Sequence, residues 1–190
     1  MSKVIYNMSM SLDGFVRASG NTPAQPLGAG GERLHQWFFG GDPANEHLVA
    51  TMLDSIGAVV SGRTTYDASD WGADGPTGPL RLPTFVVTHK APSSAPENGV
   101  YTFATGGVAQ AIHAARDAAN GKDVSVMGGP DVGCQAVAAG VVDEIVVSIV
   151  PVLFGDGLPM FASLPRHIQL ERVSLLDTSD ATHITYRIAK

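Results

Sequence analysis

A pair of glycines, Gly128-Gly129, separates a short β-branched run from a segment of small helix-forming residues. Val124 to Met127 predicts a strand, and Asp131 stands where a helix N-cap belongs, ahead of Gln135 to Ala139. A turn between a strand and a helix presents free backbone N–H groups and the positive end of the helix dipole, and glycine lets a phosphate approach the backbone. The pattern therefore suits a pyrophosphate, although a plain turn between strand and helix has the same appearance.

Two other predicted strands end in similar polar turns. Gly62-Arg63-Thr64-Thr65 follows the expected strand Ala58 to Ser61, and His89-Lys90 follows Thr84 to Thr88. Because ligands of open α/β sheets bind beyond the carboxyl ends of the strands, we expect all three turns at one edge of the sheet. Backbone donors, hydroxyls and cations at that edge predict a phosphate-bearing ligand.

Three side chains are candidates for proton chemistry. Asp13 follows the first expected strand and is either an acid or base, or a turn residue that caps Gly14. His35 and Glu32 form either a proton donor with its partner, or the solvated face of a short helix. The remaining histidines lack metal-ligand spacing, so we expect no metal site.

Hydrophobic periodicity predicts the elements that position these residues. Lys3 to Met10 alternates as a strand, and Phe15 to Gly31 is a Gly- and Pro-rich loop, either a lid or a plain surface loop. Glu32 to Phe39 suits a short amphipathic helix. A second helix begins at Asp42-Pro43, and its apolar stripe continues through Ile56.

The rest of the chain alternates strands and helices up to a long apolar strand at Glu144 to Val152. The last two alternating runs, His167 to Leu175 and Thr182 to Ile188, suit an antiparallel hairpin. This order predicts a three-layer α/β fold with a mostly parallel central sheet and antiparallel C-terminal strands. With 190 residues, 44% of them apolar, we expect one domain spanning residues 1–190.

Composition excludes several classes of function. The formal net charge is −6 and no run of Lys and Arg occurs, which argues against nucleic acid and anionic membranes as partners. No apolar stretch has the length of a membrane span and no signal peptide is evident, so we expect a cytoplasmic protein. Cys134 is the only cysteine, which rules out an internal disulfide.

Taken in order, the motifs resemble the dihydrofolate reductase-like family, in the branch that contains the reductase domain of the bifunctional riboflavin-biosynthesis deaminase-reductase. The matching segments span nearly the whole chain and are Met8 to Gly14, Gly62 to Tyr66, Thr88-His89, Val126 to Gly129, Val142 to Glu144 and Pro151 to Gly157.

The resemblance implies NADPH as a hydride donor. It implies that the turn after Ser61 serves the cofactor's phosphates, that the turn at Thr88 lies near the adenosine, and that the Gly128-Gly129 turn with the following helix receives the pyrophosphate. In this family the peptide between the paired glycines is often cis, so the resemblance also implies a cis peptide between Gly128 and Gly129. The residues assigned to the cofactor in this way are Gly62, Arg63, Thr64, Thr88, His89, Gly128, Gly129, Asp131 and Val132.

The substrate half departs from both patterns of the family. Met127 stands where the riboflavin-pathway reductases commonly have a glutamate before the paired glycines. When Trp37-Phe38 is set against the aromatic pair of dihydrofolate reductases, Leu34 takes the position of their substrate-binding carboxylate. The motif around Asp13 corresponds to the place where the family's nicotinamide and substrate meet.

Three hypotheses follow. The first is an NADPH-dependent reductase of a small heterocyclic or conjugated C=N or C=O substrate. The second is a reductase of riboflavin synthesis proper, acting on 5-amino-6-(5-phosphoribosylamino)uracil, and the third is a nucleotide-binding protein without reductase turnover. We also expect a homodimer, because the C-terminal strands leave a sheet edge and the riboflavin branch is commonly dimeric.

Overall fold

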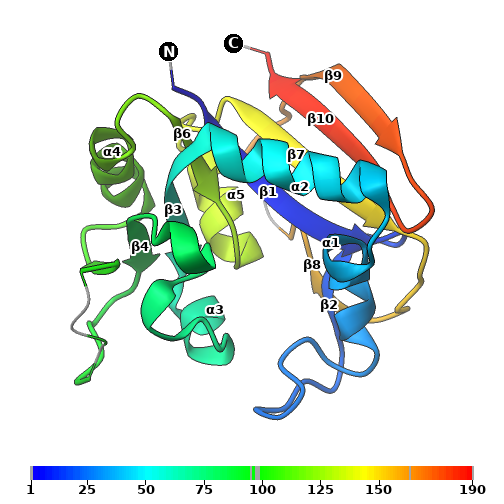
Figure 1. Ribbon diagram of the computed structural model, residues 1–190, viewed down its shortest axis with the longest axis horizontal. Coiled ribbons are helices and arrows are strands. Elements are labelled where there is room, and N and C mark those ends of the chain that lie inside the picture. Colours follow the sequence, from blue (N-terminus) through cyan, green and yellow to red (C-terminus); the bar gives the residue numbers. More distant parts are fainter. Residues whose placement is uncertain (1, 95, 97–98, 163, 190) are drawn as a thin grey trace. The chain divides into compact units, whose positions relative to one another are not determined.

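The chain divides into two compact units. The computed structural model describes residues 2–94, 96, 99–162 and 164–189. Unit 1 comprises Met1–Tyr6 and Ser55–Asp143, and unit 2 comprises Asn7–Asp54 and Glu144–Lys190. Strand β1 (Val4–Ser11) therefore begins in unit 1 and ends in unit 2 (Figure 1).

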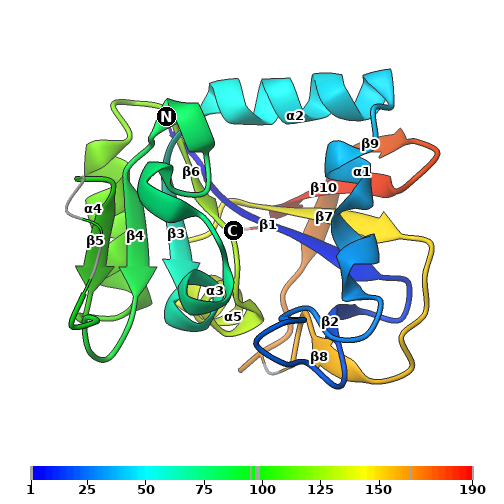
Figure 2. The ribbon, with the colours of Figure 1, turned by 60° about the horizontal axis from the view of Figure 1, so that its bottom comes forward.

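Unit 1 is built on parallel strands in the order β5-β4-β3-β6-β1. Figure 2 shows β3, β4 and β5 running in the same direction, with α3 next to the end of β3. The carboxyl ends of these strands thus face one edge. The elements are β3 (Ile56–Gly62), α3 (Arg63–Ala68), η2 (Gly72–Asp74), η3 (Gly78–Leu80), β4 (Thr84–Val87), β5 (Tyr101–Ala104), α4 (Val108–Ala118), β6 (Asp123–Val126) and α5 (Pro130–Ala138).

The core of unit 1 forms around β3, which is buried along its whole length. Helix α4 packs on β3 and β4 and carries an apolar stripe that includes Ile112 and Ala115. Helix α5 approaches β1 closely, because a Cβ at Gly133 would lie 2.1 Å from the ring of the buried Tyr6. Glycine at this position therefore sets how near the helix lies to the strand.

In unit 2 the strands follow the order β1-β7-β10-β9, and β10 pairs antiparallel with both β7 and β9. The strands β2 and β8 form a separate antiparallel ribbon. Figure 1 shows the C-terminal hairpin β9–β10 beside β7. The elements are β2 (Phe15–Ala18), η1 (Gly31–His35), α1 (Gln36–Phe39), α2 (Pro43–Ser55), β7 (Glu144–Val150), β8 (Gly157–Pro159), β9 (Leu170–Asp177) and β10 (Thr182–Ile188).

The core of unit 2 combines an apolar cluster with a buried polar chain. Leu34 and Trp37 pack against Val150 and Ala181. Beside them lies His183, whose ring is in edge contact with Trp37 and whose nitrogens lie 2.8 Å from Ser148 Oγ and 3.0 Å from Asn45 Oδ1. Each nitrogen of this buried imidazole therefore has a hydrogen-bond partner.

The predicted fold class is confirmed, with parallel strands in unit 1 and an antiparallel C-terminal hairpin in unit 2. None of the described helices combines the length and the apolar character that crossing a membrane requires.

Several predicted boundaries are wrong. The first strand of the C-terminal hairpin, predicted from His167 to Leu175, is β9 at Leu170–Asp177. Phe15 to Ala18 is not loop but strand β2, which pairs with β8, a strand that the sequence did not predict. Ile56 does not extend the helix; this β-branched residue starts β3 and pairs with Asp123. The segment Glu32 to Phe39 is a 3-10 turn followed by a single α-helical turn, although Leu34 and Trp37 point inward as expected.

Candidate functional site

The glycine turn in unit 1 differs in detail from its prediction. Gly129, not Asp131, is the N-cap of α5, because Pro130 takes the first helical position, where its fixed φ and missing N–H cost nothing. Gly128 and Gly129 have φ of 76° and 90°, and the peptide between them is trans, not cis. Two consecutive positive φ angles provide the sharp turn that the sequence analysis expected.

The turn has the shape of an anion seat. A Cβ at Gly128 would lie 2.5 Å from Thr65 Cγ2, whereas a Cβ at Gly129 would meet nothing closer than 3.7 Å. No side chain caps α5, so the first-turn N–H groups of Asp131 and Val132 have no acceptor within the helix. Closed packing behind Gly128 and open donors ahead of it fit the pyrophosphate that the resemblance implied.

Hydrogen bonds join the three polar turns of unit 1. The Gly62 N–H donates to the Gly128 carbonyl at 3.1 Å, which fixes the first turn to the glycine pair. Arg63 Nη1 donates to the Lys90 carbonyl at 3.1 Å, and Thr88 Oγ1 donates to the same oxygen at 2.8 Å. The structure thus brings together the loops after β3, β4 and β6, which the sequence placed at one sheet edge.

The guanidinium of Arg63 is already partnered. Its Nε lies 2.7 and 2.8 Å from the two carboxylate oxygens of Asp67, one helical turn ahead on α3. Asp67 was not among the predicted site residues, although the i,i+4 spacing of an Arg and an Asp indicates such a pair. Thr64 and His89 are exposed beside these groups.

In unit 2 the carboxylate of Asp13 binds the chain that follows β7. Its oxygens accept the N–H of Phe154 at 3.1 Å and the N–H of Gly155 at 2.7 Å. The Ser11 hydroxyl, together with these amides, holds the pKa of the exposed Asp13 carboxyl below its usual range. A carboxyl with a low pKa is a poor proton donor at neutral pH, so this geometry suits the turn-residue alternative better.

Two backbone bonds complete this connection. Leu12 N–H donates to the Val152 carbonyl, and Met160 N–H donates to the Gly14 carbonyl, each at 2.9 Å. The segment around Asp13 and the segment from Pro151 to Gly157 are 141 positions apart at the Asp13–Phe154 bond. Two of the motifs that carried the family resemblance are therefore one physical assembly.

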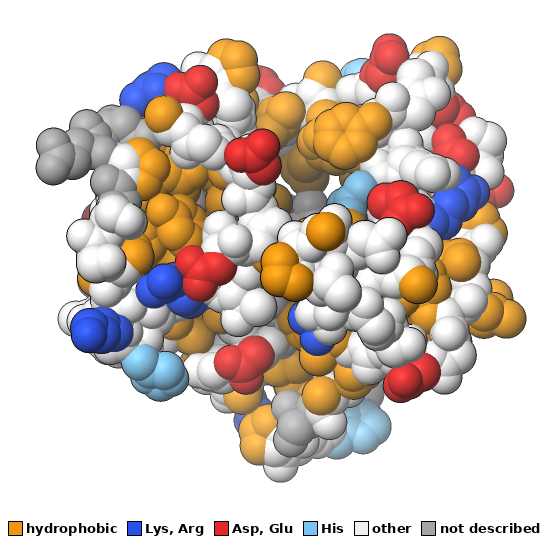
Figure 3. Space-filling model, turned by 90° about the horizontal axis from the view of Figure 1, so that it is seen from below, with side chains coloured by type: hydrophobic (Ala, Val, Ile, Leu, Met, Phe, Trp, Pro, Cys, Tyr) orange, Lys and Arg blue, Asp and Glu red, His pale blue; other side chains and the backbone are white. Residues whose placement is uncertain are grey.

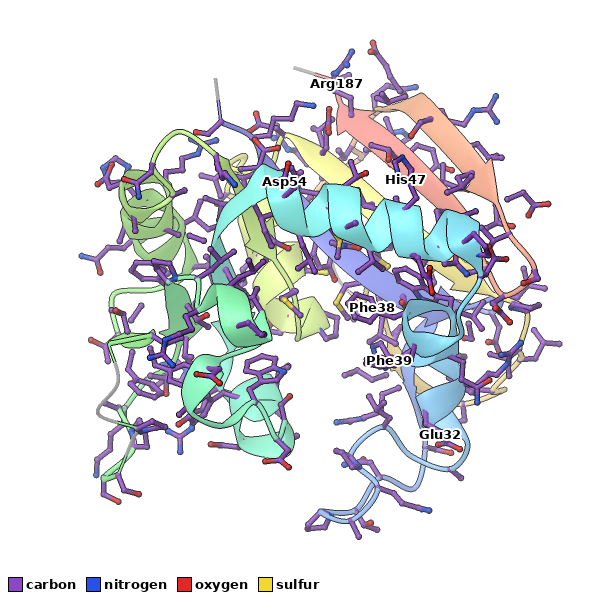
Figure 4. The ribbon with its side chains drawn as sticks, viewed as in Figure 1. Glu32, Phe38, Phe39, His47, Asp54 and Arg187 are labelled. Atoms are coloured by element: carbon purple, nitrogen blue, oxygen red, sulfur yellow. The ribbon has the colours of Figure 1, made fainter. Side chains whose placement is uncertain are left out.

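Glu32 and His35 are not brought to Asp13. Both are exposed on η1, and no hydrogen bond or ion pair among the described residues joins them to each other or to Asp13. Desolvation by surrounding protein lowers the pKa of His35, although solvent reaches its ring and limits the effect. Figure 4 shows Glu32 near the start of this helical segment and Phe38 and Phe39 at its end.

Exposed apolar side chains gather on unit 2, and the sequence analysis did not anticipate them. Phe39 is 81% exposed and packs edge-on against Phe38 with ring centroids 5.0 Å apart. Leu12 and Leu153 are also exposed, on the two segments that Asp13 joins. Hydrophobic side chains reach the surface among acidic, basic and uncharged ones on the face seen in Figure 3. Among the described residues, no three His, Cys, Asp or Glu side chains form a metal-binding group.

Comparison with known proteins identifies the family and the fold. Residues 2–184 match the family model of the RibD C-terminal domain. The chain therefore belongs to the RibD C-terminal domain family. The uncharacterized protein YwjB of Bacillus subtilis (strain 168) is 21% identical over 184 residues, which cover 97% of each chain.

Solved structures confirm the fold. A Shewanella sp. PV-4 protein whose name points to riboflavin biosynthesis aligns with a TM-score of 0.74 at 19% identity, over 99% of both chains. A deaminase and 5-amino-6-(5-phosphoribosylamino)uracil reductase from Thermotoga maritima aligns at 0.67 and 14%, over 99% of this chain and 57% of that one. Dihydrofolate reductase from Enterococcus faecalis, complexed with NADP(H), aligns at 0.59 and 15%, over 99% and 97%. The chain therefore has the dihydrofolate reductase-like fold.

Proposed function

We propose that this protein is an NADPH-dependent reductase of a small heterocyclic or conjugated C=N or C=O substrate. The observation that carries the proposal is the anion seat of unit 1, in which Gly128 is packed against Thr65 and the first turn of α5 has free N–H groups. Membership of the RibD C-terminal domain family and the NADP(H) bound by a structural relative support the choice of ligand.

The polar turns of unit 1 are the proposed cofactor-binding site. The Gly128-Gly129 turn and the N–H groups of Asp131 and Val132 hold the pyrophosphate, and Arg63 reaches the 2′-phosphate of the adenosine. When bound, the nicotinamide supplies a hydride to the substrate. In unit 2, Asp13 fixes the conformation of the turn after β1. His35 and Glu32 are the proposed acid–base pair, with His35 acting as the acid at mildly acidic pH because its pKa is lowered.

The test is a two-step titration. NADPH binding is measured by fluorescence, and NADPH oxidation is then followed across a panel of pterins, pyrimidines and quinones. We expect binding and oxidation with at least one class of substrate. Binding without oxidation across the panel would favour a nucleotide-binding protein without reductase turnover, and the absence of binding would contradict the cofactor assignment itself.

Reduction in riboflavin synthesis is the second candidate. The Thermotoga maritima relative is named as 5-amino-6-(5-phosphoribosylamino)uracil reductase, which supports adding this compound to the panel. Met127, in place of the glutamate that the riboflavin-pathway reductases commonly have there, argues against it. A higher kcat/KM for this intermediate than for every other compound would decide in its favour.

The proposed functional form is a homodimer. Strand β9 ends the strand order of unit 2, and its side chains Val173 and Leu175 are 46% and 52% exposed. An apolar edge strand invites pairing, and a symmetric dimer would cover it. Sedimentation should give twice 19.7 kDa at micromolar concentration, and a monomer alone would contradict the proposal.

A further inference from the structure

The pair Asp156-Gly157, at the start of β8, holds a carboxylate and a backbone nitrogen in close contact. Asp156 Oδ1 lies 2.8 Å from the nitrogen of Gly157, the next residue, and accepts its N–H. The carbon Cγ of Asp156 is bonded to this oxygen and therefore lies beside the same nitrogen. Asp156 is exposed, and glycine has no side chain that could shield its nitrogen. An acyl carbon and a nucleophile thus lie together within reach of water.

The same dipeptide occurs at Asp13-Gly14, where both groups are engaged elsewhere. The Asp13 carboxylate accepts the amides of Phe154 and Gly155. The Gly14 N–H donates to the Ser11 carbonyl at 2.9 Å. The lowered pKa of Asp13 also keeps its carboxyl ionised, and a carboxylate anion resists attack by a nucleophile. We therefore expect this pair to be unreactive.

The third pair, Asp74-Gly75 in unit 1, is also held apart. The Asp74 carboxylate accepts a hydrogen bond from Arg81 Nη1, seven positions further along the chain. Gly75 is buried, and a Cβ there would lie 2.8 Å from Val100 Cγ1, so this peptide has little room to turn. All three Asp-Gly pairs lie in the described part of the chain, and within it Asp156 alone directs its carboxylate to the N–H that follows.

We propose that Asp156 is a site of spontaneous isoaspartate formation. The Gly157 nitrogen forms a bond to Asp156 Cγ, and its proton leaves with the hydroxyl of the protonated carboxyl as water. A second water molecule then opens the resulting succinimide. Attack at the former main-chain carbonyl breaks the original peptide bond, leaves Gly157 attached through Cγ, and frees the main-chain carbon as a carboxylate. Nothing is oxidised or reduced and the final mass is unchanged. Contact between the reacting groups favours the first step, because near-attack geometry accelerates intramolecular reactions.

Isoaspartate adds one carbon to the main chain at a point that is held on both sides. On one side, the Gly155 N–H is bound by Asp13 at 2.7 Å. On the other, a Cβ at Gly157 would lie 2.1 Å from the Arg17 carbonyl oxygen, so the two backbones are already in contact. Figure 2 shows β2 and β8 side by side at this place. A longer chain cannot keep both contacts, so the pairing of β2 with β8 should be lost.

The test compares the three Asp-Gly pairs within one sample. Native protein and protein unfolded in guanidinium chloride are incubated at neutral pH, digested and analysed by mass spectrometry, with an isoaspartyl methyltransferase to label the new carboxylate. We expect roughly 10- to 100-fold more isoaspartate at Asp156 than at Asp13 or Asp74 in the native protein, and similar amounts at all three in the unfolded chain. Deamidation of asparagine changes the mass and is counted separately. Equal amounts in the native protein, or less at Asp156, would overturn the proposal.

The matched variant is Asp156→Glu, which keeps the charge but would have to close a larger ring, a much slower reaction. It should abolish isoaspartate at position 156 and leave the other two pairs unchanged. Hydrogen exchange at Phe15–Ala18, measured on the chromatographically separated isoaspartate form, should show lost protection relative to fresh protein. Incubated Asp156→Glu should keep that protection. Unchanged protection in the isoaspartate form would overturn the loss of pairing between β2 and β8.

Discussion

Two turns, one in each unit, shape the backbone after a strand by opposite means. In unit 1, Gly128-Gly129 turns by two positive φ angles and needs no side chain, so the N–H groups of the following helix stay open. In unit 2, the turn after β1 is held by a carboxylate, because Asp13 accepts the amides of Phe154 and Gly155. The first arrangement leaves donors for a ligand, and the second consumes them.

Because of this difference, different kinds of substitution should disrupt the two turns. The glycine turn fails when a side chain is added, because the space behind Gly128 is filled by Thr65 and Ser61. The Asp13 turn fails when an acceptor is removed or protonated. Substitutions can therefore separate ligand binding in unit 1 from loop positioning in unit 2.

The largest effect is expected from Asp13→Asn. Half of the carboxylate is replaced by an NH₂ group that cannot accept an amide N–H, so the turn loses its fixed position. Turnover should fall about 10²-fold, the scale on which misplacement of a site-forming loop acts, while NADPH affinity changes little. Steady-state kinetics and a fluorescence titration measure the two quantities. Unchanged turnover in a protein that unfolds more easily would leave Asp13 with the role of a turn residue only.

Gly128→Ala tests the glycine turn of unit 1. The added Cβ would lie 2.5 Å from Thr65 Cγ2 at a φ of 76°. Overpacking of this kind costs about 1–3 kcal/mol, beyond the roughly 1–2 kcal/mol of a left-handed alanine. Gly140→Ala is the matched control, because Gly140 also has a positive φ but nothing within 4 Å of its Cβ position. Denaturant unfolding should separate the two variants, and equal losses would show that packing behind Gly128 contributes nothing.

Arg63→Ala should weaken NADPH binding about 10- to 150-fold and leave NADH nearly unchanged, since the two cofactors differ by one 2′-phosphate. Asp67 competes for the same guanidinium, so Asp67→Asn should strengthen NADPH binding. Arg81→Ala, which breaks another exposed ion pair of unit 1, controls for the change in charge. Equal loss for both cofactors would move Arg63 to the shared pyrophosphate and transfer the 2′-phosphate to His89 and Lys90.

The order of strands and helices could be predicted from local pattern, and the parts that failed depend on distant partners. Val124 to Met127 and Gly128-Gly129 carry their structure in their own side chains and backbone freedom, so both were recognised. Strand β2 was not, since Phe15 to Ala18 becomes a strand only by pairing with Gly157 to Pro159. The hydrophobic pattern of a four-residue segment does not show which distant strand it will pair with.

The candidate site divides in the same way. The three turns of unit 1 follow from the rule that parallel strands end at one edge, and hydrogen bonds join them as that rule suggests. The role of Asp13 was ambiguous, because its amide donors lie 141 positions away in sequence.

The smallest expected effect is the change in stability with pH that the buried His183 causes. It can be compared with the effect of the exposed Asp13 in the same unit. The groups that face its ring are Ser148, Asn45 and Trp37, and all are uncharged. Burial lowers the pKa of His183, so the folded state resists the proton that the unfolded state takes up near pH 6.5.

The free energy of unfolding should therefore begin to fall as the pH drops below about 6.5. It should stop falling once the pH is below the lowered pKa that His183 has in the folded state. The slope is at most about 1.4 kcal/mol per pH unit for one proton. His183→Gln should flatten this part of the profile, whereas His47→Gln, at an exposed position on α2 (Figure 4), should leave it as in the wild type.

Asp13 affects the free energy of unfolding at lower pH, because its pKa is itself lowered. Its contribution is complete above about pH 4 and is lost as the pH falls through the pKa that Asp13 has in the folded state. Urea unfolding from pH 7 to pH 3 resolves the two windows, and a profile for His183→Gln parallel to the wild type would show that His183 is not the group that titrates.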